Sequence, residues 1–250
     1  MFSLNTGLYE FLFEGTVENE WHIILAYIGF VLITIFGSYL LGSINSAIII
    51  SKTLYHDDIR KHGSGNAGMT NMLRTYGLGA AGLTLLGDLL KTVISISIAG
   101  VLFGFGYSGG VSTQGLCYVA GLFAVVGHIF PIYYGLKGGK GVLSTATAAL
   151  VLSPVPFAFL FVIFVIVVWI SKYVSLGSVR VAVLYPITLH GYFSFVFANA
   201  ERSTPGYAAL SAIILAILIV WCHRGNLQRI SNKTERKLSF KKKEKKDDEA

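Results

Sequence analysis

Charge is scarce in this sequence, because only 13% of its 250 residues are Asp, Glu, Lys or Arg, while 54% are hydrophobic. Soluble domains carry charge on about a quarter of their residues, which gives them a polar shell in water. A water-soluble domain is therefore excluded. Apolar stretches recur along the chain, and about 20 apolar residues in a helix suffice to cross the hydrocarbon layer of a membrane. The composition predicts an all-α membrane protein that crosses the bilayer several times.

Cysteine is scarcer still, with only Cys117 and Cys222, and both fall inside apolar stretches. This pattern speaks against a disulfide framework and a cysteine-based metal site, so we expect two packing residues. Lys and Arg are absent before Lys52. Because a secretory signal peptide needs a basic segment ahead of its apolar core, we expect the first apolar stretch to remain as a membrane helix.

The apolar stretches predict seven transmembrane helices, with Pro154 and Pro156 separating the fourth from the fifth. These helices are expected at residues 22–51, 77–105, 115–136, 140–153, 155–171, 179–198 and 206–222. Residues 140–171 could instead form one re-entrant or fused element, which would leave five spans. Both numbers are odd, so the two termini are expected on opposite sides of the membrane. Residues 22–232 are expected to form a single transmembrane domain.

Basic side chains outside the spans lie in alternate loops and in the tail, and only Arg202 falls outside this pattern. The first loop carries Lys52 and Arg74, a later loop carries Lys140, and the tail carries ten more basic residues. Because Lys and Arg in short loops stay on the cytoplasmic side, the C-terminus is predicted in the cytoplasm and residues 1–21 outside. The net charge of +7 thus indicates topology and requires no nucleic-acid partner. The charged run at 233–250 has no apolar periodicity and is predicted to be a disordered cytoplasmic tail.

A first glycine-rich stretch precedes the second expected helix, and Gly63, Gly65 and Gly68 fit a G-x-G-x-x-G pattern. A dinucleotide site with that pattern needs a preceding strand and a βαβ unit, and the sequence predicts neither. Glycine still lets backbone N–H groups approach an anion, and neighbouring polar and cationic side chains add to the attraction. The alternative is a polar loop with glycines for its turns. The predicted phosphate cradle consists of Arg60, Ser64, Gly65, Asn66, Thr70, Asn71 and Arg74.

A second glycine-rich stretch places Gly138, Gly139 and Gly141 around Lys140, at the start of an expected helix. A nucleotide-binding P-loop has Ser or Thr after its lysine, whereas a glycine follows Lys140. The stretch is therefore not a nucleotide loop. Flexible glycines beside a cation at a helix N-terminus nevertheless predict a second anion site.

Two further pairs of polar residues lie at the same expected face of the membrane. Ser175 and Ser178 open the sixth expected helix, where they could be either a helix cap or ligands. His223 and Asn226 follow the last expected span and are three residues apart, so they would share one face of a helix.

Ionisable residues also occur inside the expected spans. Asp88 and Lys91 are three residues apart in the second span. Charges in hydrocarbon are costly, so we expect the two to pair, either as a structural element or beside the substrate, although Lys91 could also extend to the membrane surface. His128 by itself is more typical of a structural histidine than of a ligand.

Four motifs follow one another in order between the hydrophobic stretches: G-S-G-N-x-G-x-T-N-x-x-R, then G-H-x-F-P with K-G-G-K-G, then S-L-G-S, then H-R-x-N. In this order they resemble the bacterial PlsY family over about residues 42–235. The resemblance implies transfer of a fatty acyl group from acyl phosphate to the 1-hydroxyl of glycerol 3-phosphate, giving lysophosphatidic acid and phosphate. It implies no coenzyme A, metal or other cofactor, no obligate protein partner, and a place in phospholipid biosynthesis at the bacterial plasma membrane.

The resemblance also carries over site residues. Positions that line the phosphate site of the family are matched by Ser64, Asn66, Thr70, Arg74, Lys140, Ser178, His223 and Asn226. The catalytic role is expected for Ser64, Arg74, Lys140, His223 and Asn226. No protein nucleophile is required, because acyl phosphate is already activated, and a substrate phosphate could accept the hydroxyl proton. Whether His223 acts as a base or as a phosphate ligand stays open.

The sequence departs from the family pattern at three places. Asn45 stands where proline commonly follows G-S-I, Thr92 stands where glycine is common, and Lys233 stands where glycine usually precedes Thr-Glu. These departures leave room for a paralogue with a different acceptor. The alternative function is a transporter or channel for phosphate or a small phosphorylated metabolite, because glycine-interrupted helices and basic residues also build transport sites. The inverted repeat expected of such a transporter is not apparent.

Overall fold

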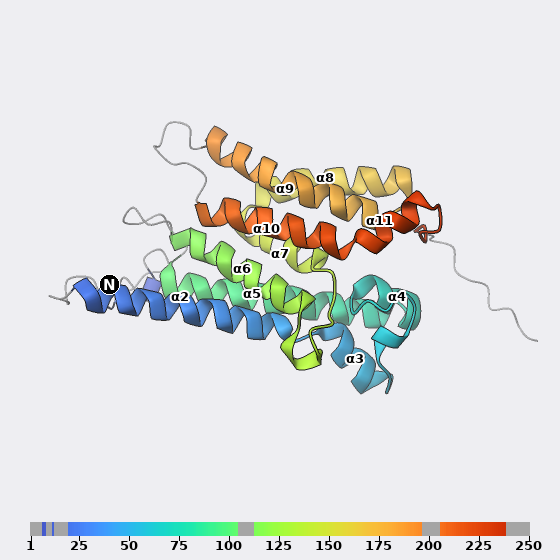
Figure 1. Cartoon of the computed structure of the whole chain (residues 1–250), viewed down its shortest axis with the longest axis horizontal. Helices are drawn as coiled ribbons and strands as arrows, with labels where there is room; N and C mark the ends of the chain where they lie inside the picture. Colours follow the sequence, from blue (N-terminus) through green and yellow to red (C-terminus); the bar gives the residue numbers. More distant parts are fainter. Residues whose placement is uncertain (1–6, 9–11, 13–19, 105–112, 197–205, 239–250) are drawn as a thin grey trace, which may run out of the picture.

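Helices make up the regular structure in the part of the chain that the computed structural model describes, residues 7–8, 12, 20–104, 113–196 and 206–238. None of these residues lies in a strand, which confirms the all-α prediction for the described part. The long helices run side by side along one direction, and the first residues of α2 (Glu20–Ser43) and the helix α11 (Arg224–Ser231) lie at opposite ends (Figure 1). The long helices are α2, α5 (Leu78–Phe103), α6 (Thr113–Ile129), α8 (Pro154–Ser171), α9 (Val174–Val196) and α10 (Gly206–Cys222).

Short helices gather at the end of the molecule opposite the first residues of α2 (Figure 1). They are α3 (Ser46–Leu54), α4 (Met69–Tyr76) and α11 (Arg224–Ser231), with the 3-10 turns η1 (Ile59–Lys61) and η2 (Ile132–Tyr134). The sequence did not predict α4 as a helix. It follows Gly68 and ends at Gly77, whose φ of 88° is readily adopted by glycine and seldom by other residues.

The first predicted span is interrupted. We expected one helix over 22–51, but α2 ends at Ser43 and α3 begins at Ser46. Asn45 starts the new helix, because its Oδ1 accepts a hydrogen bond from the backbone N–H of Ile48 at 3.0 Å. Capping by Asn45 therefore accounts for a helix start at the position where the family commonly has proline.

Four helical segments in the described part are long and apolar enough to cross a membrane, and a fifth is obtained if α10 and α11, bent by 52°, form one span. The four are Ile24–Leu54, Leu78–Phe103, Gly115–Tyr134 and Pro154–Ser171. All seven predicted segments contain a helix. However, α7 (Val142–Leu152) has 11 residues, which rise only about 16 Å, roughly half of the hydrocarbon thickness. The multi-pass membrane protein is thus established, while seven spans stay a prediction.

The connection between α7 and α8 shows whether residues 140–171 form two helices or one fused element, which the sequence left open. Ser153 ends α7 and Pro154 is the first residue of α8, so residues 140–171 form two separate helices. Proline is well tolerated at that first position because its missing N–H has no partner in the helix anyway.

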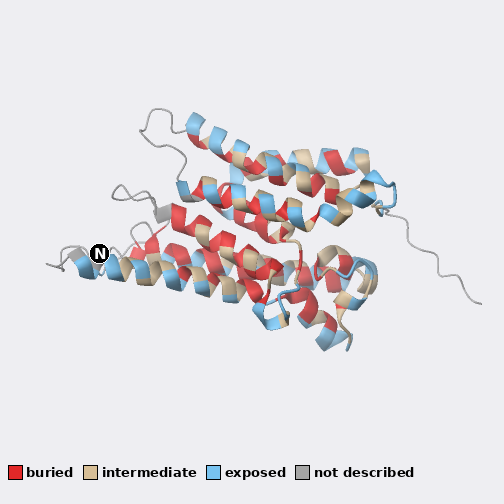
Figure 2. Ribbon diagram, in the orientation of Figure 1, coloured by how far each residue is buried: buried red, intermediate tan, exposed pale blue. Residues whose placement is uncertain are grey.

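Helix α6 lies at the centre of the core, between α2, α5, α7 and α10. Small residues let it approach α2 closely: a side chain at Gly42 would collide with the backbone of Ala124, and one at Gly127 with the backbone of Tyr39. Cys117 is buried in this core, as predicted, and no disulfide joins it to Cys222. Figure 2 shows buried residues concentrated along α6 and along the inner faces of its neighbours.

The outer faces of the helices are strongly apolar. Trp169 and Ile170 in α8 are 71% and 76% exposed, and Ile33, Phe36 and Ile187 also lie on the outside. Such surfaces are unfavourable in water but suit contact with lipid chains, since every backbone polar group of the helix is satisfied internally. The exposed apolar faces therefore agree with membrane insertion.

Candidate functional site

A cavity of about 560 Å³ opens between the loop–helix segment that leads into α4, the start of α7, the first turns of α9 and the junction of α10 with α11. Four predicted motifs, far apart in the sequence, contribute to its wall. All five side chains predicted to be catalytic line it: Ser64, Arg74, Lys140, His223 and Asn226. Of the residues predicted to bind phosphate, it is also lined by Asn66, Thr70, Asn71, Gly141, Ser175 and Ser178.

Lys140 lies at the polar end of the cavity, immediately before Gly141, the N-cap residue of α7. Its Nζ donates a hydrogen bond to Oδ1 of Asn226. Burial lowers the pKa of the Lys140 ammonium below its ordinary value. A cation held in this way, with Arg74 on the same cavity wall, can bind a phosphoryl group and stabilise charge that develops on it.

Residues 233–238, which we call the strap, fold back beside this cation. The backbone N–H of Leu238 donates to the carbonyl of Lys172 at 2.7 Å, between α8 and α9. Within the strap, Glu235 accepts hydrogen bonds from Ser175 at 3.0 Å and from Asn226 at 2.6 Å. We assigned these residues to a disordered tail, whereas the structure holds them against the site. Residues 239–250 of that predicted tail lie outside the described residues.

Glu235 and Arg236 line the cavity, yet our reading of single residues missed both. Glu235 lies in a stretch of mixed charge, and such a stretch gives no sign of a folded partner. The available signal was the family pattern, which extends as far as the Thr-Glu pair that ends in Glu235.

Replacing Glu235 with glutamine is expected to make the stability of the fold less dependent on pH in acid. Burial alone would raise the pKa of this carboxyl, but hydrogen bonds from Asn226, Arg229 and Ser175 outweigh burial and hold it below its ordinary value of 4.5. A carboxyl with a lower pKa in the folded state stabilises the fold above the ordinary value, and this stabilisation disappears as the pH falls through the folded pKa. Thermal unfolding measured from pH ~7 to ~3 should show a steeper loss in the parent than in Glu235→Gln. Identical acid profiles would contradict the assignment.

His223 is 3% exposed, and its ring lies on the cavity wall. Nδ1 is 2.8 Å from the carbonyl oxygen of Ile219. Because a carbonyl only accepts, Nδ1 must carry the hydrogen, and Nε2 of the neutral ring is left as an acceptor. His223 can therefore accept a hydrogen bond from a hydroxyl group in the cavity.

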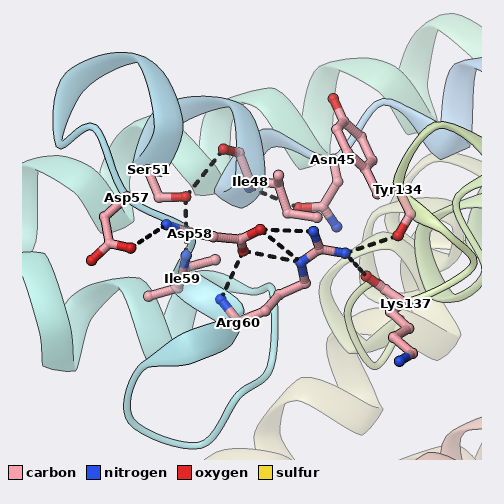
Figure 3. A network of polar contacts seen from close by, with 9 residues as sticks. All are labelled: Asn45, Ile48, Ser51, Asp57, Asp58, Ile59, Arg60, Tyr134 and Lys137. Carbon is pink, nitrogen blue, oxygen red and sulfur yellow. Dashed lines mark hydrogen bonds and ion pairs between the residues drawn. The ribbon is translucent and has the colours of Figure 1, made fainter.

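Arg60, predicted to bind phosphate, does not line the cavity. Its guanidinium instead joins the first glycine-rich stretch to the second, donating to the carbonyls of Tyr134 at 2.8 Å and Lys137 at 3.3 Å (Figure 3). Asp58 holds it in place through an ion pair of 2.7 Å. The hydrogen bond from Arg60 lowers the pKa of the Asp58 carboxyl to about 2. Arg60 thus fixes the relative position of the two loops.

Several other predicted phosphate donors are occupied by the protein itself. The N–H groups of Gly138 and Gly139 donate to the carbonyls of Ile129 and His128 at 3.1 and 3.0 Å, and neither glycine lines the cavity. Gly65 does not line it either. The side chain of Asn71 accepts from the N–H of Ser64 and donates to the carbonyls of Ile59 and His62. These residues shape the loops and leave Ser64 and Asn66 on the cavity wall.

The predicted pair in α5 is present: Nζ of Lys91 is 2.9 Å from Oδ1 of Asp88, and both side chains are buried. Lys91 therefore does not extend to the membrane surface and does not line the cavity. Asp88 and His128 both line the cavity and lie beside one another, with Nδ1 of His128 3.5 Å from the carboxylate of Asp88. Ser46 adds a hydrogen bond to Asp88 at 3.1 Å.

The rest of the cavity wall is apolar and forms what we call the apolar slot. It is lined by side chains of α5, α7, α8 and α9, including Leu85, Leu150, Phe157, Leu160, Phe161 and Tyr185. Two of these, Leu150 and Phe161, are also 46% and 53% exposed, so the slot is open between α7 and α8. The slot therefore reaches the lipid-facing side, and the whole cavity suits an amphiphile with a phosphorylated head and a hydrocarbon tail.

The sequence of this chain is similar to those of known membrane enzymes. The family model for glycerol-3-phosphate acyltransferase covers residues 32–233. A glycerol-3-phosphate acyltransferase of Mycoplasmopsis agalactiae is 40% identical over 227 residues, covering 82% of this chain and 92% of that protein. The Halalkalibacterium halodurans protein of the same name is 42% identical over 211 residues, covering 83% of this chain and 95% of the relative.

Two crystal structures of PlsY, an integral membrane glycerol 3-phosphate acyltransferase, have a similar fold. The glycerol 3-phosphate form superposes with a TM-score of 0.70 at 31% identity and covers 84% of this chain and 96% of that one. The lysophosphatidic acid form gives a TM-score of 0.68 at 29% identity, over 84% and 95% of the two chains. The helices described above therefore share their arrangement with a solved membrane enzyme.

Proposed function

Because this chain belongs to the glycerol-3-phosphate acyltransferase family and is a membrane acyltransferase, we propose that it takes its acyl group from acyl phosphate. The acceptor in this proposal is the 1-hydroxyl of glycerol 3-phosphate, and the products are lysophosphatidic acid and inorganic phosphate. One observation carries the proposal: a cationic polar pocket and the apolar slot are two ends of one cavity. An acyl phosphate has a charged head that fits the polar pocket and a hydrocarbon tail that fits the apolar slot.

In the proposed reaction, the hydroxyl oxygen of glycerol 3-phosphate bonds to the acyl carbon, and the bond from that carbon to the phosphate oxygen breaks. The electron pair leaves with the phosphate, which also takes the hydroxyl proton. Lys140 and Arg74 stabilise the phosphate charge, and Nε2 of His223 accepts a hydrogen bond from the non-reacting 2-hydroxyl of glycerol 3-phosphate, which orients the acceptor. Ser64, Asn66, Thr70 and the Ser175–Ser178 turn complete the phosphate contacts. No side chain forms a covalent intermediate.

We also propose that the polar end of the cavity faces the cytoplasm. The short helices and loops at that end carry most of the basic residues of the chain, among them Lys52, Lys137 and Lys172, and segments rich in such residues remain on the cytoplasmic side. The N-terminal segment 1–21 would then lie outside, after seven passes through the plasma membrane by one domain. Glycerol 3-phosphate would enter from the cytosol, and the acyl donor from the membrane.

The donor is tested by supplying the purified protein in lipid nanodiscs with glycerol 3-phosphate and either acyl phosphate or acyl-CoA. Lysophosphatidic acid formed from acyl phosphate alone supports the proposal, and formation from acyl-CoA alone overturns it. A transporter of phosphate or a phosphorylated metabolite was the alternative from the sequence. Uptake of labelled phosphate into sealed vesicles, with no acyl transfer to glycerol 3-phosphate, would favour that alternative.

A further inference from the structure

Lys91 has three N–H bonds, and the structure gives each of them an acceptor. Its Nζ is 2.9 Å from the carbonyl oxygen of Ile44, 2.9 Å from Oδ1 of Asp88 and 2.9 Å from Nδ1 of His128. An ammonium group can only donate, and its ion pair with the Asp88 carboxylate keeps it charged. Nδ1 of His128 must therefore be the acceptor, so it carries no hydrogen.

The position of the hydrogen on the other ring nitrogen of His128, Nε2, follows from this. A neutral histidine has one N–H, so with Nδ1 as acceptor the hydrogen of His128 resides on Nε2. Among the described residues no hydrogen bond to Nε2 is found, and Nε2 is not one of the fully buried side-chain atoms that lack a partner, so part of its surface stays accessible. His128 is only 4% exposed and lines the cavity. Its N–H is thus a donor offered to whatever occupies the cavity.

The surroundings of Nε2 place it at the meeting point of both glycine-rich stretches. A side chain at Gly139 would collide with Nε2 of His128 and come close to the carbonyl of Ala67. Glycine at position 139 therefore leaves room for the imidazole directly before Lys140 in the chain. The backbone N–H of Gly139 also donates to the carbonyl of His128, so the loop that carries Lys140 is bonded to the backbone of the histidine.

We infer that His128 is a catalytic residue whose Nε2–H donates a hydrogen bond to the carbonyl oxygen of the acyl donor as negative charge develops there. A carbonyl fits better than a phosphate, because the cluster of Asp88, Lys91 and neutral His128 has no net charge, whereas Lys140 and Arg74 provide the positive charge for phosphates. A preorganised neutral donor in a buried site is well suited to an oxyanion. The inference rests on the proposed function only in taking an acyl donor as substrate.

Three substitutions at one position test this role. Glutamine places its amide nitrogen near the position of Nε2, asparagine places its amide near Nδ1, and alanine offers neither. We expect His128→Ala and His128→Asn to lower kcat about 10²-fold or more, with the KM for glycerol 3-phosphate within twofold. His128→Gln should keep a substantially larger kcat than His128→Asn. His190→Ala, on the exposed side of α9, serves as the matched control and should match the parent.

The outcomes separate the competing roles. A KM that rises while kcat is kept would assign His128 to ground-state phosphate binding, and equal losses in the glutamine and asparagine variants would reduce it to a packing role; both overturn the inference. Long-range ¹H–¹⁵N correlation spectra of labelled protein provide a readout independent of activity, and a hydrogen on Nδ1 would also overturn it. If the parent uses only acyl-CoA, the proposed donor fails, yet the same variants still test His128, because both donors present a carbonyl.

Discussion

Replacing Lys140 with alanine is expected to lower kcat by about 10³-fold while the protein stays folded. The reason is that Nζ of Lys140, bonded to Asn226 at the polar end of the cavity, neutralises charge on the leaving phosphate during acyl transfer. Formation of lysophosphatidic acid at saturating substrate measures kcat, and the thermal unfolding midpoint in the same detergent reports folding.

Lys137 provides the matched control for this variant. It lies three residues earlier in the same loop, and its side chain is exposed and does not line the cavity. Lys137→Ala should therefore keep turnover within about twofold, as surface substitutions away from such features generally have small effects. Near-normal turnover in Lys140→Ala, or an equal loss in both variants, would remove Lys140 from the catalytic group.

Replacing Asp88 with asparagine is expected to destabilise the protein by roughly 3–5 kcal/mol, because the change leaves the charge of Lys91 buried without its anionic partner. Both side chains are almost fully buried between the helix break and α6. Thermal or denaturant unfolding in detergent measures the loss, and turnover of the remaining folded fraction shows whether the site survives.

A double variant distinguishes the lost ion pair from a general packing defect. Removing both charges, as in Asp88→Asn with Lys91→Met, is often close to neutral, because no uncompensated charge remains. We expect the double variant to recover most of the stability that Asp88→Asn loses. A double variant that is less stable than Asp88→Asn would indicate that the bond from Lys91 to the carbonyl of Ile44 matters more than the charge balance.

Hydropathy predicted the long helices well, because burial and lipid contact both select apolar residues over an entire helix. The second span, expected at 77–105, is observed at Leu78–Phe103. The break between α2 and α3 could not be predicted from the same signal, since Asn45 lies within a long apolar run. Its side chain acts as a cap only once the chain turns there. Helix α4 has only 8 residues and depends on its neighbours for stability.

The residue types predicted an anion-binding site, but they did not predict which acceptor each hydrogen-bond donor contacts. Cations and hydroxyls near glycines predicted an anion site, and most of the predicted residues reach one cavity. Arg60, Gly138 and Gly139 instead donate their N–H groups to backbone carbonyls of the protein itself. A sequence cannot separate a donor that binds a ligand from one that binds another part of the protein, because the two cases differ only in three-dimensional distance. The roles of all these residues in catalysis stay predictions.

The three bonds of Lys91 make position 91 unusually intolerant of a change that keeps the charge. Arginine has a flat group with five N–H bonds pointing in fixed directions, while the three acceptors around Nζ surround a single atom. A guanidinium there could serve the Asp88 carboxylate only by moving away from Ile44 or from His128. Lysine and arginine have the same charge, so it is the shape of the cationic group at position 91 that decides which ring nitrogen of His128 carries the hydrogen.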